Sequence, residues 1–526
     1  MTRRPLQLPT PGFIITLIVG LLVAFALGKL AGNGDFEKIA AIVTITVAFL
    51  VCMILKTRIW LIIPFCWTLT GQISVLPLPF SVRELAALTV FALFLGFYAL
   101  KLIPKSHPTG WIDGLVILNV CYLATVYLRN PVGLSAFGSS MVGGRPYFSV
   151  FIACLVFWIL SRVSIGEKMA TRLPLVLFMG PMLMSTIGLF TYWFPSTVPF
   201  IAPFYNGLSI ENYMESQQSP IEVAGPEGSG RITSLAPVGQ IGILALASYF
   251  RPISFLLPIN PIRFILFSLF VLATLLSGFR GAFINVGVSM LLSSHYRSGS
   301  KDVLRILFFS GAVLLVAIIG NGTMFTLPLS VQRTLSFLPG HWDERAAEEA
   351  TDSTNWRTKM WKEVWFSDKW IKNKILGDGF GFSEYDLRIM QEGAWGGPGF
   401  IGGSTSEAQM IQGAYHSGPL SAIRYVGIIG LLLYVALLLL LASQAVKFIR
   451  RATGTAFLPA ALFIGIPLIF EPFNYLFIFG GYDSGISNTI FNAALLKMLD
   501  VSLKKVVDNT TPIPSSIEDR LIHQPL

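Results

Sequence analysis

Long apolar stretches separated by shorter polar gaps make up most of this chain. About fourteen stretches come close to the roughly 17–25 residues that an α-helix needs to cross a bilayer. The pattern therefore predicts a series of transmembrane helices, of which the third and the last two fit it least well. Their approximate limits are 12–31, 39–55, 59–77, 84–101, 110–128, 146–160, 173–193, 235–250, 262–278, 281–295, 305–325, 419–443, 456–472 and 482–500.

The composition agrees with this pattern. Of the 526 residues, 53% are hydrophobic and 13% are charged, whereas a soluble domain has about 25% charged residues. We expect an all-α polytopic membrane protein with about 12–14 transmembrane helices. The first stretch resembles a signal sequence, but it is long enough to span and no convincing A-x-A cleavage site follows, so we interpret it as an uncleaved helix. The four cysteines lie in apolar runs and predict no disulfide framework.

The distribution of basic residues predicts the orientation. A net charge of +10 is compatible with nucleic-acid binding, but the lysines and arginines concentrate in every second gap, which is the positive-inside pattern of membrane proteins. This pattern excludes a nucleic-acid partner and places both termini in the cytoplasm. The basic gaps contain Arg3 and Arg4; Lys56 and Arg58; Lys101 and Lys105; Arg162, Lys168 and Arg172; Arg251 and Arg263; Arg297, Lys301 and Arg305; Lys447, Arg450 and Arg451; and Lys504 and Lys505.

Two polar segments are too long for simple turns. Because successive gaps alternate between the two sides of the membrane, both segments fall on the outer side. They cover about 194–234 and 326–418, and the second is slightly acidic. The predicted organisation is a transmembrane bundle of about eleven helices over 1–325, a large periplasmic loop over 326–418, C-terminal transmembrane helices over 419–505, and a cytoplasmic tail over 506–526. We expect the tail to be disordered because it is polar and rich in Pro and Ser.

The large loop contains a predicted helix in "DSTNWRTKMWKEVWFSDKW". Trp356, Met360, Trp361, Val364 and Trp365 share one helical face, and Asp352 or Ser353 is the expected N-cap. Such a helix either lies on the outer membrane surface or packs against the transmembrane helices, and the residues alone favour neither. The following "GDGFGF" predicts turns. No strand precedes it, so it is not a nucleotide-binding loop.

Arg280 stands out in "LLSGFRGAFINVGVSMLL", because it is a full charge between two apolar stretches. The parity places it where two helices meet at the outer surface, and a charge there is less costly than one at the bilayer centre. Small neighbours allow close helix packing at such a turn. A guanidinium at this level is suited to bidentate phosphate binding; the alternative is a snorkelling or salt-bridged arginine.

Other polar residues recur at the same outer level. Arg231, Arg145, Arg357 and Arg424 all oppose the positive-inside trend, which favours an anionic ligand that approaches from the membrane. His416, in "IQGAYHSGPLSAIRYVGIIGLLLYV", lies where the large loop enters a span. A histidine there is a candidate general base; the alternative is a structural histidine at the interface.

The sequence contains no H-E-x-x-H, G-x-S-x-G, Walker or D-x-D motif. Asp35 and Glu37 form a D-x-E in the first outer loop, but this loop is very short, so we predict no metal site and no cofactor.

Taken in order, these features resemble the O-antigen ligase and O-antigen polymerase family of bacterial membrane proteins. The resemblance covers about Gly228 to Gly430. It rests on Arg231 before an inward span, the "S-G-x-R-G-A" of Ser277 to Ala282, the "R-x-x-x-W" of Arg357 and Trp361, the "G-x-G-x-G" of Gly377 to Gly381, and His416 before the "G-x-x-G-L-L" of Gly427 to Leu432. The chain departs from the family at Ser417, where Asn is common, and near Tyr425 and Val426, where an acidic residue is common.

The resemblance implies a function similar to that of C-type glycosyltransferases. A glycan would pass from undecaprenyl diphosphate to an acceptor hydroxyl on a glycan, lipid or protein, at the periplasmic face of the bacterial inner membrane. His416 would be the base, and Arg280 and Arg231, with Arg357, Arg145 and Arg424 nearby, would bind the diphosphate without a metal. The residues do not separate ligase from polymerase. The alternative from another class is a transporter or flippase for a polysaccharide precursor or other solute, which more often carries ionisable residues near the midplane.

Overall fold

The chain forms an all-α polytopic membrane protein. The computed structural model describes residues 28–73, 80–101, 110–133, 143–201, 234–382 and 413–510, together with positions 25, 205, 232, 386, 410 and 411. Within these residues there are helices and two isolated β-bridges but no strand. Six of the described helices are long and apolar enough to cross a membrane: α4, Val82–Ala99; α5, Trp111–Arg129; α7, Glu167–Trp193; α15, Ser300–Gly320; α20, Gly418–Ala452; and α21, Leu458–Phe473 with its π-helical extension η4, Asn474–Ile478.

Several shorter or less apolar helices complete the described part of the chain. Four of them are apolar: α2, Phe36–Leu55; α6, Gly144–Leu160; α11, Leu235–Tyr249; and α13, Pro261–Leu276. Two long helices carry more polar residues: α14, Arg280–Ser298, and α22, Tyr482–Thr510. The remainder are η1, Lys56–Leu61; α3, Ile62–Cys66; η3, Pro195–Thr197; α8, Val198–Ile201; α12, Ile253–Leu256; α16, Leu329–Leu335; and α17, Glu344–Phe366.

Most predicted spans coincide with one of these helices, because an apolar run in lipid must satisfy its backbone hydrogen bonds internally. The prediction for 59–77 is wrong. There the chain forms η1 and the five-residue α3, and regular helix ends at Cys66. Thr68, Thr70 and Gln72 interrupt the apolar run just beyond this point. The first predicted span, 12–31, lies mostly outside the described residues.

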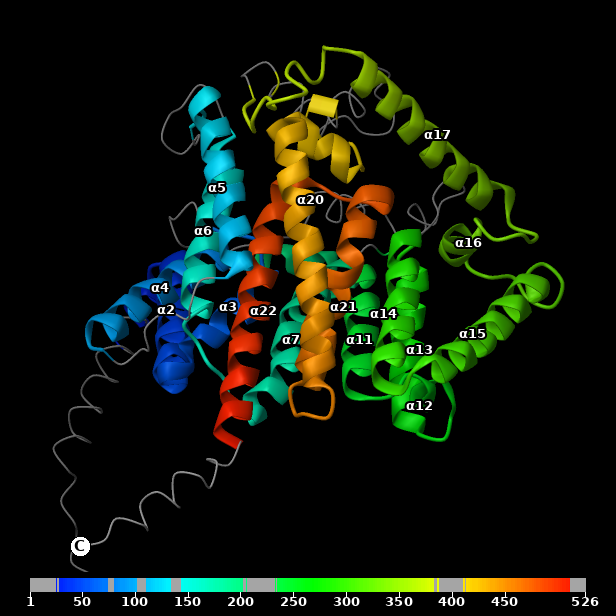
Figure 1. Ribbon diagram of the computed structural model, residues 1–526, viewed down its shortest axis with the longest axis horizontal. Coiled ribbons are helices and arrows are strands. Elements are labelled where there is room, and N and C mark those ends of the chain that lie inside the picture. Colours follow the sequence, from blue (N-terminus) through cyan, green and yellow to red (C-terminus); the bar gives the residue numbers. More distant parts are fainter. Residues whose placement is uncertain are drawn as a thin grey trace, which may run out of the picture.

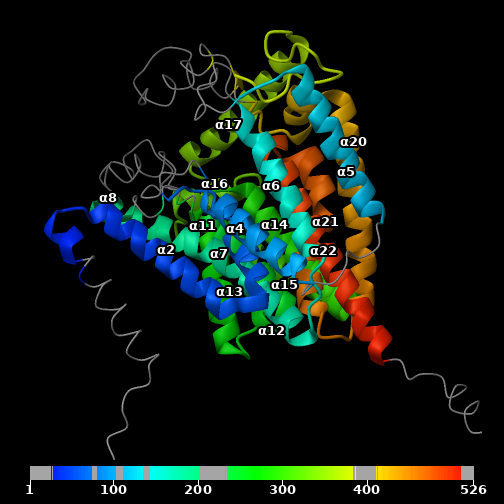
Figure 2. The same cartoon turned by 90° about the vertical axis from the view of Figure 1, so that its left-hand side faces the viewer.

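The core lies among the C-terminal helices. Buried residues of α20, α21 and α22 form one cluster with residues of α5 and α6, which come from the first third of the chain. Figure 2 shows α5, α20 and α22 along one side of the molecule and α2 on the other side. Segments separated by some 300 residues of sequence therefore form one packed bundle.

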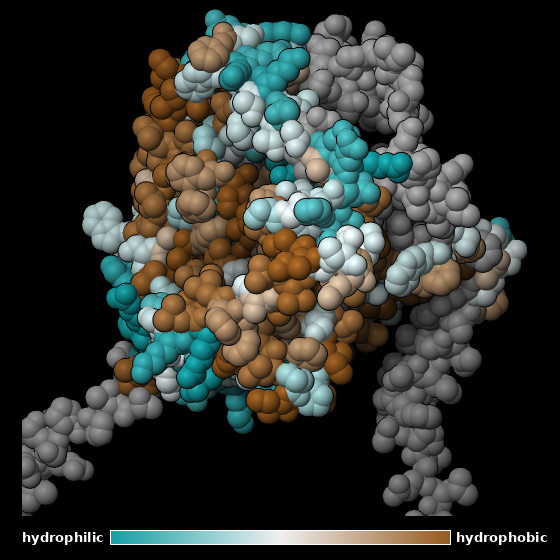
Figure 3. All heavy atoms as spheres, turned by 90° about the vertical axis from the view of Figure 1, so that its right-hand side faces the viewer, coloured by the Kyte–Doolittle hydropathy of each residue, from teal (hydrophilic) through white to brown (hydrophobic). Residues whose placement is uncertain are grey.

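The outward-facing surface of the bundle is apolar, as a lipid environment requires. On α15, Phe308, Val313 and Ile319 are each more than 60% exposed, and α13 exposes Ile262 and Leu269. Figure 3 shows hydrophobic residues dominating the middle of this face, with hydrophilic residues gathered toward its upper and lower ends. The distribution matches a helical bundle that is surrounded by lipid at mid-height.

Helix α20 is interrupted near its outer end, and another segment of the chain forms hydrogen bonds with it there. Gly427 has φ of 70° and ψ of −179°, so the helical hydrogen bonds across it are lost. Residues 374–379, which we call the docking segment, replace them. The N–H of Ile428 donates to the Lys374 carbonyl (2.8 Å), and the carbonyls of Arg424 and Tyr425 accept from the docking segment at 2.9 and 3.0 Å. The "GDGFG" motif therefore forms main-chain hydrogen bonds with the interrupted part of α20. This agrees with the turns predicted for the motif.

Replacing Gly427 by alanine should destabilise the protein by more than about 2 kcal/mol, the range of a strained and overpacked position. A Cβ at this position would lie 2.1 Å from the Ile375 carbonyl oxygen, and its φ is in the left-handed region. Thermal unfolding in detergent measures the loss. The matched control is Gly311→Ala in α15, where a Cβ meets no described atom within 4 Å. Equal unfolding temperatures for the two variants would contradict the docking arrangement.

Candidate functional site

A cavity of about 430 Å³ opens where α20 and α22 begin. It is lined by the segment that precedes α20, by the turn that precedes α22, and by Phe380 and Phe382, which follow the docking segment. The lining residues used below are Pro146, Tyr415, His416, Tyr425, Asp483 and Ser484. In Figure 1 this is the upper end of the bundle, beneath α17. The cavity therefore lies on the side that the charge pattern predicts to be periplasmic.

His416, predicted as the base, lines this cavity in a constrained conformation. It is one of only two described non-glycine residues with a positive φ, at 50°. Its ring contacts Trp356 edge-on at 5.9 Å and Phe479 at 5.5 Å between centroids. Left-handed backbone in a non-glycine residue costs on the order of 1–3 kcal/mol and persists only where surrounding contacts enforce it. The imidazole is thus held in one orientation between two aromatic rings.

Hydrogen bonds fix the backbone on both sides of His416. The indole N–H of Trp361 donates to the Tyr415 carbonyl at 2.7 Å, and the Tyr475 hydroxyl donates to the Gly418 carbonyl at 2.7 Å. Both donors come from other elements, α17 and η4. The position of the histidine therefore depends on tertiary packing and not on its local sequence alone.

The tryptophan helix packs against the bundle. Met360 and Val364 are buried with Tyr415 and Ile423, and Trp361 packs against this cluster. Of the two predicted arrangements, packing on the transmembrane helices is the one found for this face. Trp365 nevertheless remains 42% exposed.

The predicted cap of this helix is wrong. Helix α17 begins at Glu344, and the Asp343 side chain caps it by accepting the N–H of Arg345 at 3.0 Å. The sequence "ERAAEEATDSTN" has no apolar period, but it is rich in Glu and Ala, which favour helix. Intrinsic propensity thus extends the helix by roughly three turns before the apolar face begins at Trp356.

Two of the predicted arginines are electrostatically coupled to each other, and one of them to His416. Burial lowers the pKa of His416, and the charge of Arg357 lowers it further. Burial and the charge of Arg357 also lower the pKa of Arg280. Arg357 therefore lies within Coulomb range of both residues. Three residues that are 60 to 140 positions apart in the sequence converge at one end of the bundle.

Arg357 keeps a donor that no described residue uses, and Arg280 lies at the turn between two helices. Arg357 is half-buried, and its Nε has no hydrogen-bond partner among the described residues. Arg280 begins α14 directly after the turn at Gly278, whose φ is 71°, so two helices do meet there as predicted. A Cβ added at Gly281 would meet no described atom within 4 Å. Among the described residues nothing packs against Gly281, whereas its small neighbours Ser277 and Ala282 are buried at this turn.

The remaining predicted arginines have different surroundings. Arg145 pairs with the buried Glu84 at 3.1 Å. Arg424 pairs with Asp378 at 2.8 Å, and the same carboxylate accepts the N–H groups of Lys372 and Asn373. The ion pair with Arg424 thus helps to hold Asp378 and the docking segment in their observed conformation. Arg231 lies outside the described residues.

The structure adds two polar residues to the cavity that the sequence pattern did not single out. Asp483 and Ser484, at the start of α22, line the cavity together with His416. The sequence feature that could have identified them is an acidic residue, Asp483, in the short outer gap "GGYDSG". A carboxylate and a hydroxyl facing the same space can hydrogen-bond an incoming hydroxyl group.

His416 is better suited to act as a base than its neighbour Tyr415. Burial raises the pKa of Tyr415 to about 12, so the phenol keeps its proton at neutral pH. The lowered pKa of His416 leaves its imidazole neutral under the same conditions. Among the described residues, no group of three His, Cys, Asp or Glu side chains is arranged to hold a metal ion. Asp35 forms an ion pair with Lys38 at 3.1 Å, and the side chain of Glu37 is not described.

The pH dependence of activity should report the coupling between Arg357 and His416. A base must be neutral, so activity should fall as the pH drops through the pKa of His416, which is held below its usual 6.5. In Arg357→Gln the positive charge is removed, so the pKa of His416 should rise. The acidic limb of the pH–rate profile should therefore move to higher pH. Arg357→Lys keeps the charge and should leave the limb close to that of the wild type. Rates measured between pH 5 and 8 for the three proteins provide the comparison; identical limbs would contradict the coupling.

The sequence matches no known protein-family model and no curated protein closely enough to indicate a common origin. The resemblance to O-antigen ligases and polymerases therefore rests on the motifs and their order, and it stays a prediction.

Proposed function

We propose that this protein is a membrane glycosyltransferase that moves a glycan from an undecaprenyl diphosphate carrier to an acceptor hydroxyl, at the periplasmic face of the bacterial inner membrane. The observation that carries the proposal is that His416 lines a cavity at one end of an apolar bundle, and that Arg357 lies within Coulomb range of both His416 and Arg280. A base and two guanidinium groups are what transfer from a lipid diphosphate requires.

The reaction follows from these groups. His416 takes the proton of the acceptor hydroxyl, and the oxygen attacks the anomeric carbon of the donor sugar. The bond between that carbon and the diphosphate oxygen breaks, and the electron pair leaves with the diphosphate. Arg280 and Arg357 stabilise the charge that develops on this leaving group, which is the role that fixed cations play in phosphate chemistry.

Asp483 and Ser484 have a place in this scheme on the acceptor side. They line the cavity with His416, whereas Arg357 lies in α17 and Arg280 at the start of α14. We assign the cavity to the acceptor and the region of the two arginines to the donor diphosphate. The imidazole would then lie beside the acceptor hydroxyl and within hydrogen-bond reach of its proton, as a general base must.

The test is transfer by the purified full-length protein in lipid nanodiscs. The protein is mixed with undecaprenyl-diphosphate-linked oligosaccharide and a glycan, lipid or protein acceptor, and the products are identified by mass spectrometry. We expect a glycan on the acceptor and released undecaprenyl diphosphate, with little effect of EDTA. A longer lipid-linked glycan would indicate a polymerase, and a glycan on a separate acceptor a ligase. Movement of intact donor across the bilayer without cleavage would support the transporter alternative and refute the proposal.

A further inference from the structure

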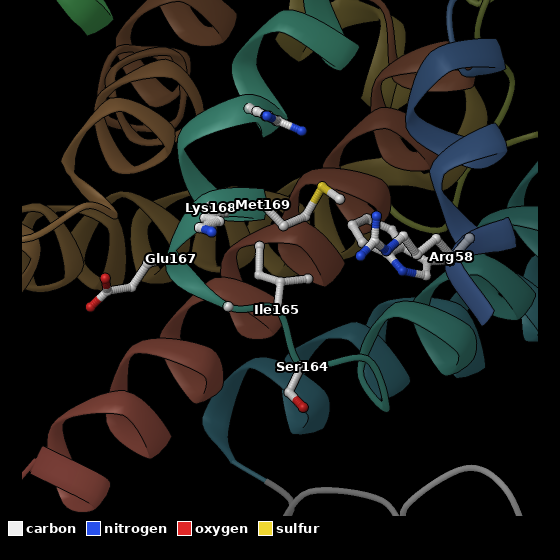
Figure 4. Close-up of a pocket in the computed structure, with 9 residues that line it drawn as sticks. Arg58, Ser164, Ile165, Glu167, Lys168 and Met169 are labelled. Atoms are coloured by element: carbon white, nitrogen blue, oxygen red, sulfur yellow. The ribbon is translucent and has the colours of Figure 1, made fainter. Parts of the chain in front are cut away.

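A second cavity, of about 510 Å³, lies at the opposite end of the bundle from His416. Helix α6 connects the two ends, because Pro146 near its start lines the first cavity and its last residue, Leu160, shortly precedes Ser164 in the second. The second cavity is formed by η1 and by the segment from Ser164 through the first turns of α7. Figure 4 shows these two segments facing each other. Two gaps that the charge pattern predicts to be cytoplasmic, 56–58 and 162–172, thus meet at one cavity.

The cavity carries excess positive charge. Arg58, Lys168 and Arg172 line it, and all three are exposed. None of them forms an ion pair with a residue in the described part of the chain. Glu167 is the single acid among the lining residues, and in Figure 4 its side chain points away from Arg58. The cavity therefore favours an anionic ligand.

Apart from Ser164, the remaining walls of the cavity are apolar. Trp60 and Ile165 are only 4% and 6% exposed, and Met169 extends toward Arg58 in Figure 4. Helix α2 ends at Leu55, directly before η1, and its last turns expose Leu50 and Ile54 at 52% and 77%. An apolar surface of the membrane-facing kind thus leads to the rim of a basic cavity. A soluble phosphate would use only the cations, whereas a lipid would use both features.

We propose that this cavity binds the phosphate of an anionic phospholipid, with an acyl chain along the exposed face of α2. Arginine binds phosphate through two parallel hydrogen bonds, and basic pockets at the cytoplasmic side of membrane helices are suited to acidic head groups. The site would secure the N-terminal part of the bundle to the cytoplasmic leaflet, separately from the transfer site at the other end.

The test compares the binding of three probes to the purified full-length protein in detergent: short-chain phosphatidylglycerol, short-chain phosphatidylcholine and sn-glycerol 3-phosphate. The variant is R58Q/K168Q/R172Q, and the matched control is K301Q/K447Q/R450Q, which removes three exposed basic residues of other predicted cytoplasmic gaps. All six side chains are exposed, so unfolding temperatures should be unchanged in both.

We expect saturable binding of phosphatidylglycerol in preference to phosphatidylcholine. The cavity variant should weaken it on the order of 100-fold, since each basic residue contributes about 1 kcal/mol at an anionic lipid surface. The control should bind as the wild type does. An equal loss in the control would reduce the effect to general surface charge and overturn the site. Full displacement of the lipid by sn-glycerol 3-phosphate would identify a soluble phosphate as the ligand and overturn the lipid assignment.

Discussion

Replacing His416 by alanine should reduce glycan transfer by at least about 100-fold, the usual effect of losing a general base, while the lipid-linked donor still binds. The donor's diphosphate contacts come from Arg280 and Arg357 in this proposal, and the substitution leaves both in place. The imidazole lines a cavity and is only partly buried, so its loss leaves the packed core of the bundle intact. The measurement pairs donor binding with transfer rate for the same detergent-purified protein.

The matched control is His341→Ala, at an exposed position in the same large loop. Its backbone carbonyl accepts the Asn321 amide at 2.7 Å, and its side chain forms no hydrogen bond with the part of the chain that the structure describes. This variant should transfer glycan at the wild-type rate. An active His416→Ala would refute the assignment of the base, and a loss of donor binding together with transfer would instead indicate a role in the shape of the site.

Replacing Arg280 by lysine should also reduce transfer strongly, on the order of 100-fold, although the charge is kept. Lysine cannot present two parallel N–H groups to a phosphate, so the leaving group loses its bidentate partner in the transition state. Arg357→Lys should behave in the same direction, because the two guanidinium groups lie in one electrostatic cluster. Arg231→Ala should act similarly if Arg231 joins them.

The control for this substitution is Arg345→Lys, an exposed arginine near the start of α17. It should leave transfer and donor binding unchanged. Unchanged donor binding in both Arg280→Lys and Arg357→Lys would refute the diphosphate clamp. If only Arg280→Lys binds normally, the clamp belongs to Arg357, whose Nε has no described partner.

The helices and their order are readable from the sequence because lipid acts on each apolar run locally. A run of sufficient length becomes a helix whatever surrounds it, since its backbone groups have no other partners. The same reasoning failed at 59–77, where polar residues end the helix early. It also placed the start of α17 too late, because helix propensity, not apolar period, determines that end.

The arrangement of the candidate site depends on contacts that no local pattern contains. The sequence could single out His416, Arg357 and Arg280 by residue type and predicted side of the membrane, but not their proximity. That proximity depends on the packing of α17 against α20 through Met360 and Val364, and on the Trp361 hydrogen bond to Tyr415.

The sequence alone therefore determined an all-α membrane protein and the approximate positions of its long described helices, because hydrophobic burial in lipid depends on the length and composition of single segments. Only the tertiary structure decided that α20 breaks at Gly427, that residues 374–379 repair the break, and that Asp483 shares a cavity with His416. These features join positions that are 50 to 70 residues apart, and each depends on hydrogen bonds or packing that exist only once both segments are in place.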